Sequence, residues 1–202
     1  MFDRLFGSFA ALSLVSLVIL GAGQTVVDAK SVGDHQLIAA KKPNLATNDP
    51  QVIMETSKGT IRIVVYRKDV PITGGNFLDL VSKGFYNGLS FHRYEPGFAL
   101  FGGDPRGDGT GTYVDPQTHS ERKIPLEIKP AFRHSDAGIV AMARSSDPNS
   151  GSCQFYITIA AAPKLDGEYA VFGKVIDGMS TVMSLRKGDK IVHAEVKEPG
   201  GK

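Results

Sequence analysis

One arginine, Arg93, lies in a run made mostly of aromatic, apolar and glycine residues, FHRYEPGFALFGGD at 91–104. A guanidinium stays charged at any relevant pH and holds its donors in a rigid plane. Such a group among aromatic side chains suits a non-covalent reaction on a peptide, or plain peptide binding. Neither use requires an acid or base with a tuned pKa, because no proton is transferred.

The patterns of other common sites are missing from the sequence. The five histidines form no HxxxH pair with an acidic residue, and there is no CxxC, so no metal site is predicted. The glycines of GDGTGTY (107–113) lack the Lys-Ser/Thr of a phosphate loop, and NSGSCQF (149–155) is not a nucleophile elbow. We therefore expect neither a metal nor a cofactor. The single cysteine, Cys153, is interpreted as a small residue in or beside a strand, with a nucleophilic or redox thiol as the alternative.

Composition indicates one folded domain. The chain has 202 residues, of which 42% are hydrophobic and 22% charged, enough for a core in an ordinary globular protein. The net charge is only +2 and the basic residues are dispersed, which argues against a nucleic-acid partner. With one cysteine no internal disulfide forms, so stability must come from core burial. We expect a monomer.

The N-terminus predicts export. After Arg4 the chain is apolar only from Phe9 to Leu20, shorter than the roughly 20 residues of a membrane span. Val27 and Ala29 suit a cleavage site, so we expect a signal peptide over 1–29, with an uncleaved membrane anchor as the alternative. The expected location is the periplasm or an equivalent extracytoplasmic compartment. Residues 30–50 are predicted to be a flexible arm, 51–197 the folded domain and 198–202 a tail.

Short strands dominate the folded domain. Alternating or continuous apolar runs predict strands within 51–57, 60–66, 89–96, 98–104, 137–143, 154–160, 168–176 and 190–198, and a short strand-like stretch at 123–128 in an otherwise loop-rich region, 105–136. Lys58-Gly59 is a hairpin signal. Two helices are expected, one starting at Pro71 and stopping near Gly84, the other within 178–188. This pattern favours a mainly β fold, a closed barrel or sandwich with two helices as caps.

Three blocks give the sequence a specific resemblance. FHRYEPGFALFGGD (91–104), GIVAMARSSDPNSGSCQFYI (138–157) and LDGEYAVFGKVIDGM (165–179) resemble the cyclophilins, a family of peptidyl-prolyl cis-trans isomerases. The likeness extends over about residues 51–197. It implies a closed eight-stranded antiparallel barrel capped by two α-helices, and proline-containing unfolded or extended polypeptides as substrates. An isomerase that assists the folding of exported proteins is the predicted function.

The resemblance also implies the site. Arg93 matches the family's catalytic arginine. The implied substrate-binding positions are Phe98, Ala99, Phe101, Ala143, Arg144, Gln154, Tyr156, Leu165 and Tyr169.

Three positions depart from the family pattern. Phe101 replaces a glutamine that steadies the arginine, Arg144 replaces an asparagine, and Lys164 stands where the family often has Trp or Phe. Lys164 predicts weaker binding of cyclosporin-type macrocycles. Phe101 and Arg144 motivate the alternative function, a proline-peptide-binding module or holdase with low turnover.

Overall fold

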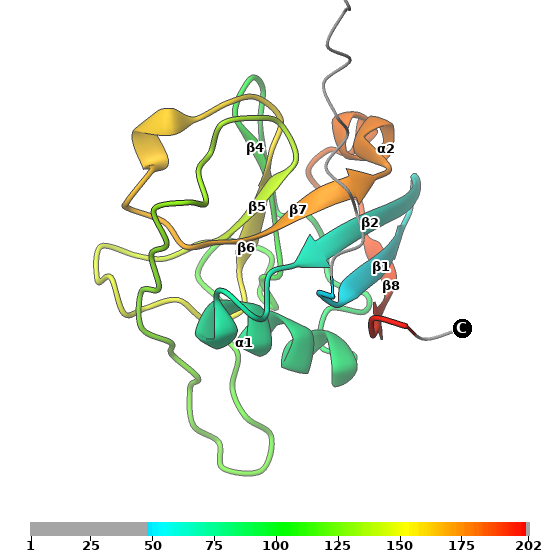
Figure 1. Cartoon of the computed structure of the whole chain (residues 1–202). Helices are drawn as coiled ribbons and strands as arrows, with labels where there is room; N and C mark the ends of the chain where they lie inside the picture. The colour runs from blue at the N-terminus through cyan, green and yellow to red at the C-terminus, as the bar shows by residue number, and fades with distance from the viewer. Residues whose placement is uncertain (1–47, 201–202) are drawn as a thin grey trace, which may run out of the picture. The chain divides into compact units, whose positions relative to one another are not determined.

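The computed structural model describes residues 48–200, in which eight strands and two α-helices form the domain (Figure 1). The strands are β1 (Gln51–Thr56), β2 (Gly59–Val65), β3 (Arg93–Glu95), β4 (Ala99–Gly102), β5 (Ile139–Met142), β6 (Phe155–Thr158), β7 (Val171–Asp177) and β8 (Ile191–Lys197). The helices are α1 (Pro71–Ser82) and α2 (Met179–Ser184), with a short 3-10 helix, η1 (Pro163–Leu165).

All eight strands belong to one antiparallel sheet in the order β3-β4-β6-β5-β7-β2-β1-β8. The segments directly before the two edge strands meet at an isolated bridge between Ser90 and Lys190. There the Phe91 N–H donates to the Asp189 carbonyl at 2.8 Å. The predicted eight-stranded antiparallel fold is therefore confirmed, with the curled sheet closed by this bridge instead of a full ladder between β3 and β8.

The two helices cover opposite ends of the sheet, as predicted (Figure 1). Helix α1 begins with Pro71, whose missing N–H has no intrahelical partner at this position in any case. Its buried face includes Phe77, Leu80 and Val81. The chain leaves the helix through Gly84, whose φ of 67° lies in the left-handed region that glycine tolerates. Helix α1 contacts β7 and β8, whereas α2 contacts β2.

The β1–β2 hairpin fixes the register of the buried strands. Thr56 pairs with Gly59 across a turn made by Ser57 and Lys58, one residue earlier than the predicted Lys58-Gly59 turn. This register turns Ile61 and Ile63 into the core.

One expected strand is wrong. Residues 123–128 form no strand, although Ile124 makes an isolated bridge to Gly151. Pro125 follows directly and has no N–H to extend a ladder.

The residues that flank the predicted domain on each side bond to the end of β2 or to the turn that follows it. The Val65 N–H donates to the Pro50 carbonyl at 2.9 Å, and Glu198 forms an ion pair with Arg67 at 2.9 Å. The predicted signal peptide (1–29) and most of the predicted arm (30–47) lie outside the described residues. Between residues 48 and 200, no helix is long and apolar enough to cross a membrane.

Candidate active site

A cleft of about 670 Å³ brings together all the predicted site residues except Ala99. Its lining residues are His92, Arg93, Phe98, Phe101, Asp108, Gly109, Ala143, Arg144, Gln154, Tyr156, Lys164, Leu165, Tyr169 and Lys187. They come from β3, β4, β6, η1 and six connecting segments, so the cleft exists only in the folded sheet. Ala99 is fully buried on β4, in the cluster that also holds Tyr156.

The β3–β4 hairpin positions Arg93. Its turn is closed by the Phe98 N–H donating to the Glu95 carbonyl at 3.1 Å, and Gly97 takes a φ of 72° there. The antiparallel register places Phe101 directly opposite Arg93. Arg93 keeps 55% of its side chain exposed, so the guanidinium faces the cleft opening while its strand is fixed.

Phe101 supports Arg93 with an aromatic face. The guanidinium carbon lies 4.7 Å from the centre of the Phe101 ring, a cation–π geometry. Glu95, two residues along the same strand, forms an ion pair with the same guanidinium. Phe101 thus stands where the family pattern has a polar amide, and Glu95 adds a carboxylate partner from β3.

Replacing Phe101 tests this platform. We expect Phe101→Leu to lower kcat/KM for an Xaa-Pro peptide by about two- to fivefold, because an exposed cation–π contact contributes about 0.5–1 kcal/mol. Phe101→Tyr keeps the ring and is expected to match the wild type, whereas Phe101→Gln supplies a hydrogen-bonding amide and should recover rate relative to Phe101→Leu. Kinetics of prolyl isomerisation by NMR exchange measure all three. Equal rates for Phe101→Leu and the wild type would show that the ring does not support Arg93.

Aromatic side chains form an apolar slot beside Arg93. The Phe98 and Tyr156 ring centres lie 6.4 Å apart, and Phe101 lies 5.5 Å from Tyr156. Leu165, at the end of η1, lines the same space. A slot of this kind accepts a small apolar ring next to a fixed guanidinium.

A buried polar relay lies behind the slot. Asp166 accepts hydrogen bonds from the His134 backbone N–H at 2.7 Å and from the ring Nδ1 at 2.9 Å. The ring Nε2 lies 2.9 Å from the Tyr156 hydroxyl. Because an ionised carboxylate only accepts, Nδ1 carries a proton toward Asp166, while Nε2 pairs with the Tyr156 hydroxyl. The relay ties the ring of Tyr156 to the segment that carries Leu165.

The relay makes stability depend on pH through Asp166. Hydrogen bonds from the His134 backbone and then from its ring lower the pKa of Asp166 below its ordinary value. A carboxyl with a depressed folded pKa stabilises the fold above its unfolded pKa of about 3.9 and loses that contribution as pH falls through the folded pKa. We expect the wild type to exceed Asp166→Asn in free energy of unfolding at about pH 5, where Asp166 is ionised, and this gap to shrink below about pH 4. Urea unfolding across this pH range measures the gap, and a gap that stays constant at acid pH contradicts the role.

The remaining predicted residues form the rim of the cleft. Gln154 donates to the Gly109 and Gly111 carbonyls at 3.1 and 2.7 Å, which fixes the amide beside the 107–113 loop. Arg144 folds back onto Glu168, with its Nη2 at 3.0 Å from Oε2 and its guanidinium 4.8 Å from the Tyr169 ring centre. Its charge is therefore engaged within the rim.

The structure adds cleft residues that sequence reasoning did not assign. His92, Asp108, Gly109 and Lys187 all line the cleft, and Lys164, noted only as a departure, joins them. Burial lowers the pKa of His92, so its ring is neutral at pH 7. His92 neighbours Arg93 in the sequence and was therefore detectable, whereas nothing in its local sequence marks Lys187.

The sequence also raised the questions of a reactive thiol at Cys153 and of a metal site. Cys153 is fully buried in the core, and this burial raises the pKa of its thiol to about 11. An inert core residue is thus the better interpretation of Cys153. Within residues 48–200, no group of three or more His, Cys, Asp or Glu side chains is arranged to hold a metal ion.

Comparisons with known proteins agree with this geometry. Residues 51–199 match the family model described as cyclophilin type peptidyl-prolyl cis-trans isomerase/CLD. Peptidyl-prolyl cis-trans isomerase-like 1 of Rhizopus delemar is 43% identical over 141 residues, covering 69% of this chain and 82% of that protein. A Synechocystis protein named as a thylakoid lumen peptidyl-prolyl cis-trans isomerase is 39% identical over 175 residues, covering 72% of this chain and 46% of that protein.

A solved structure of a cyclophilin-type isomerase has a fold similar to that of this chain. The crystal structure of a Cryptosporidium parvum cyclophilin type peptidyl-prolyl cis-trans isomerase, in the presence of the dipeptide Ala-Pro, superposes with a TM-score of 0.66 at 31% sequence identity. The match covers 73% of this chain and 98% of that one. With the family model, the curated relatives and the fold in agreement, this chain belongs to the cyclophilin-type peptidyl-prolyl cis-trans isomerases.

Proposed function

We propose that this protein accelerates rotation about Xaa-Pro bonds of extended or unfolded polypeptides, with Arg93 as its catalytic residue. The observation that carries the proposal is that Arg93 and the apolar slot of Phe98, Tyr156 and Leu165 line one cleft. The Cryptosporidium relative crystallised in the presence of Ala-Pro supports a proline-containing peptide as the occupant.

The chemistry requires a donor at the moment when the bond is twisted. Rotation about the planar peptide bond crosses a barrier of about 18–20 kcal/mol, and uncatalysed X–Pro exchange takes tens to hundreds of seconds. In the twisted state resonance is lost, so the imide nitrogen becomes pyramidal and can accept a hydrogen bond. In the planar form its lone pair is delocalised and is not available as an acceptor. A fixed guanidinium next to the proline ring donates that bond, which stabilises the transition state more than the ground state.

The walls of the cleft serve the same step. The proline ring fills the slot against Phe98 and Tyr156 and excludes water, which strengthens the interaction with Arg93. Gln154 and backbone groups near Arg144 hold the flanking peptide in an extended form. The reaction transfers no proton, so it needs no acid or base, and both cleft arginines are held in ion pairs.

We infer that the substrates are exported polypeptides. The apolar segment from Phe9 to Leu20 and the thylakoid lumen name of the Synechocystis relative support this setting. N-terminal sequencing of the mature protein from an extracytoplasmic fraction is expected to start at Lys30. A chain that begins at Met1 and sediments with membranes would favour the anchored alternative.

A binding module with low turnover is the second candidate, since Glu95 and Phe101 both engage the Arg93 guanidinium. NMR exchange spectroscopy on an Ala-Ala-Pro-Phe peptide separates the two. Acceleration of cis-trans exchange by catalytic amounts of the protein establishes the isomerase. Saturable binding of the peptide without acceleration establishes the module.

A further inference from the structure

The charges around the cleft are unevenly compensated. Its lining includes four basic side chains and one carboxylate, namely Arg93, Arg144, Lys164, Lys187 and Asp108. The two arginines are matched by Glu95 and Glu168, which lie beside the cleft. The charges that remain are two lysines and one carboxylate, Asp108, so the electrostatic potential in the cleft is positive.

The two lysines have no carboxylate of their own. Among residues 48–200, neither Lys164 nor Lys187 has a carboxylate within ion-pair distance. Asp108 is engaged by neutral donors, since it accepts from the Thr110 N–H at 2.8 Å and from the Thr110 hydroxyl at 2.7 Å. An incoming carboxylate can thus pair with either ammonium without breaking an existing bridge.

Lys164 is placed over the slot itself. It belongs to η1, directly before Leu165, and its ammonium lies 5.6 Å from the centre of the Phe98 ring. That ring is a wall of the apolar slot. A side chain next to a proline bound in the slot is therefore within the field of this ammonium.

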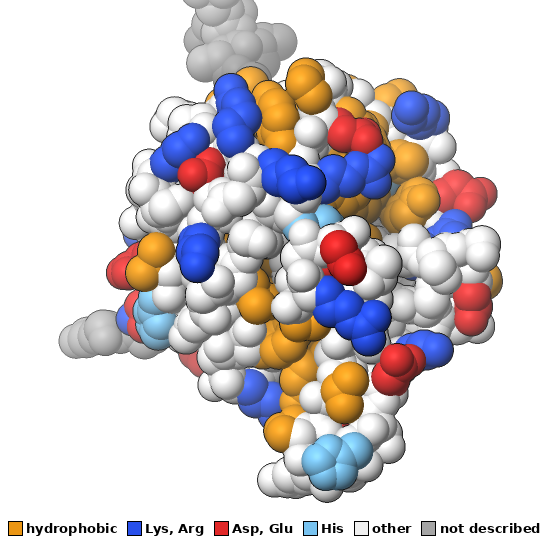
Figure 2. Space-filling model, turned by 180° about the vertical axis from the view of Figure 1, so that it is seen from behind, with side chains coloured by type: hydrophobic (Ala, Val, Ile, Leu, Met, Phe, Trp, Pro, Cys, Tyr) orange, Lys and Arg blue, Asp and Glu red, His pale blue; other side chains and the backbone are white. Residues whose placement is uncertain are grey.

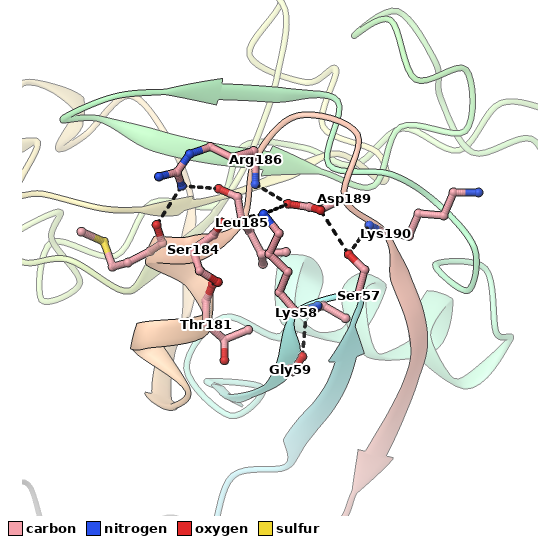
Figure 3. Close-up of polar contacts among 11 residues, drawn as sticks. Ser57, Lys58, Gly59, Thr181, Ser184, Leu185, Arg186, Asp189 and Lys190 are labelled. Carbon is pink, nitrogen blue, oxygen red and sulfur yellow. Dashed lines mark hydrogen bonds and ion pairs between the residues drawn. The ribbon is translucent and has the colours of Figure 1, made fainter.

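Lys187 reaches the cleft from a separate and well-braced segment, the loop from Leu185 to Lys190. Asp189 holds that loop by accepting from the Arg186 N–H at 2.6 Å and by pairing with Lys58 at 2.9 Å (Figure 3). Lys187 lines the same cleft as His92 and Arg93. Figure 2 shows the face opposite to the view of Figure 1, on which Lys and Arg side chains gather in the upper half beside hydrophobic ones.

We propose that the cleft selects Xaa-Pro segments that carry a Glu or Asp side chain directly before or after the proline, through Lys164 and Lys187. This selectivity rests on the isomerase function proposed above and names its substrate class. The apolar slot takes the proline ring, and the two lysines attract the neighbouring carboxylate. A basic neighbour meets the same charges with the opposite sign and is disfavoured.

Matched peptides test the selectivity. The peptides are Ala-Xaa-Pro-Ala-Phe and Ala-Ala-Pro-Xaa-Phe, with Xaa as Glu, Gln or Lys and with blocked ends. NMR exchange spectroscopy gives kcat/KM for each peptide at two salt concentrations, about 0.02 M and about 0.5 M. The higher concentration screens exposed charges, so it shows how much of any difference is electrostatic. At low salt we expect kcat/KM for the Glu peptide to exceed that for the Gln peptide by about two- to fivefold in at least one of the two positions. This is the size of effect that one exposed ion pair produces. Lys should fall below Gln, and all differences should shrink at high salt.

Variants assign the effect to the lysines. Lys164→Gln and Lys187→Gln are each expected to reduce the Glu-to-Gln ratio, and the double variant should bring it close to one. Lys197→Gln, on β8 outside the cleft, is the matched control and should leave the ratio unchanged. If no peptide is accelerated, the proposed isomerase function fails. If Glu, Gln and Lys peptides are accelerated equally, or if the ratio survives the double substitution, the isomerase stands and the selectivity by these lysines is overturned.

Discussion

Arg93→Ala is expected to lower kcat/KM for an Xaa-Pro peptide by about 100-fold or more, the usual effect of removing one preorganised donor from a transition state. The expectation follows from the position of the guanidinium at the mouth of the cleft, with 55% of the side chain exposed and its planar face on Phe101. The fold should remain intact, because an exposed side chain contributes little to core packing. NMR exchange or a coupled assay measures the rate, and circular dichroism checks the fold.

Two further variants sharpen the result. Arg93→Lys keeps the positive charge but loses the planar fork, so it should recover only a small part of the lost rate. Arg67→Ala removes an exposed arginine that pairs with Glu198 away from the cleft, and should leave the rate unchanged. If Arg93→Ala retains half of the wild-type rate, the hydrogen bond from Arg93 is not the source of catalysis.

His134→Ala is expected to lower the free energy of unfolding by about 2–4 kcal/mol, the combined effect of a cavity and an unpaired buried hydroxyl. The imidazole is fully buried and bonds to Asp166 on one side and to Tyr156 on the other. Its loss also frees the Tyr156 ring, so kcat/KM should fall together with stability. Urea unfolding measures the first effect, and peptide exchange measures the second at temperatures where the variant is folded.

A double-mutant cycle distinguishes the relay from simple packing. Tyr156→Phe removes only the hydroxyl and should lower the free energy of unfolding by about 1–2 kcal/mol, because the His134 Nε2 is left unpaired. If the hydrogen bond couples the two residues, the double variant loses less stability than the sum of the single losses. Strictly additive losses would mean that each side chain stabilises the fold independently.

Much of the fold was predictable because its signals are local. Alternating apolar residues and turn residues mark a strand wherever it is later paired, and Pro71 and Gly84 mark the two ends of α1. The exception, residues 123–128, shows the limit of such signals. An apolar run becomes a strand only with a partner ladder, and Pro125 removes a donor that the ladder needs.

Local patterns in the sequence were sufficient to predict the family resemblance, the mainly β class with two helices, and a short strand–turn–strand that carries Arg93 next to Phe98. The surroundings of that arginine, in contrast, follow from the packing of the whole fold. Phe101 is its platform because the β3–β4 register sets the two opposite each other. Residues far apart in the sequence, such as His134 with Asp166, or Lys187 with the other residues of the cleft, come together because of the sheet order and the loops. The spacing of apolar residues along the chain indicates whether a segment is a helix or a strand. Contacts between residues that are distant in the sequence depend instead on how all the elements pack together.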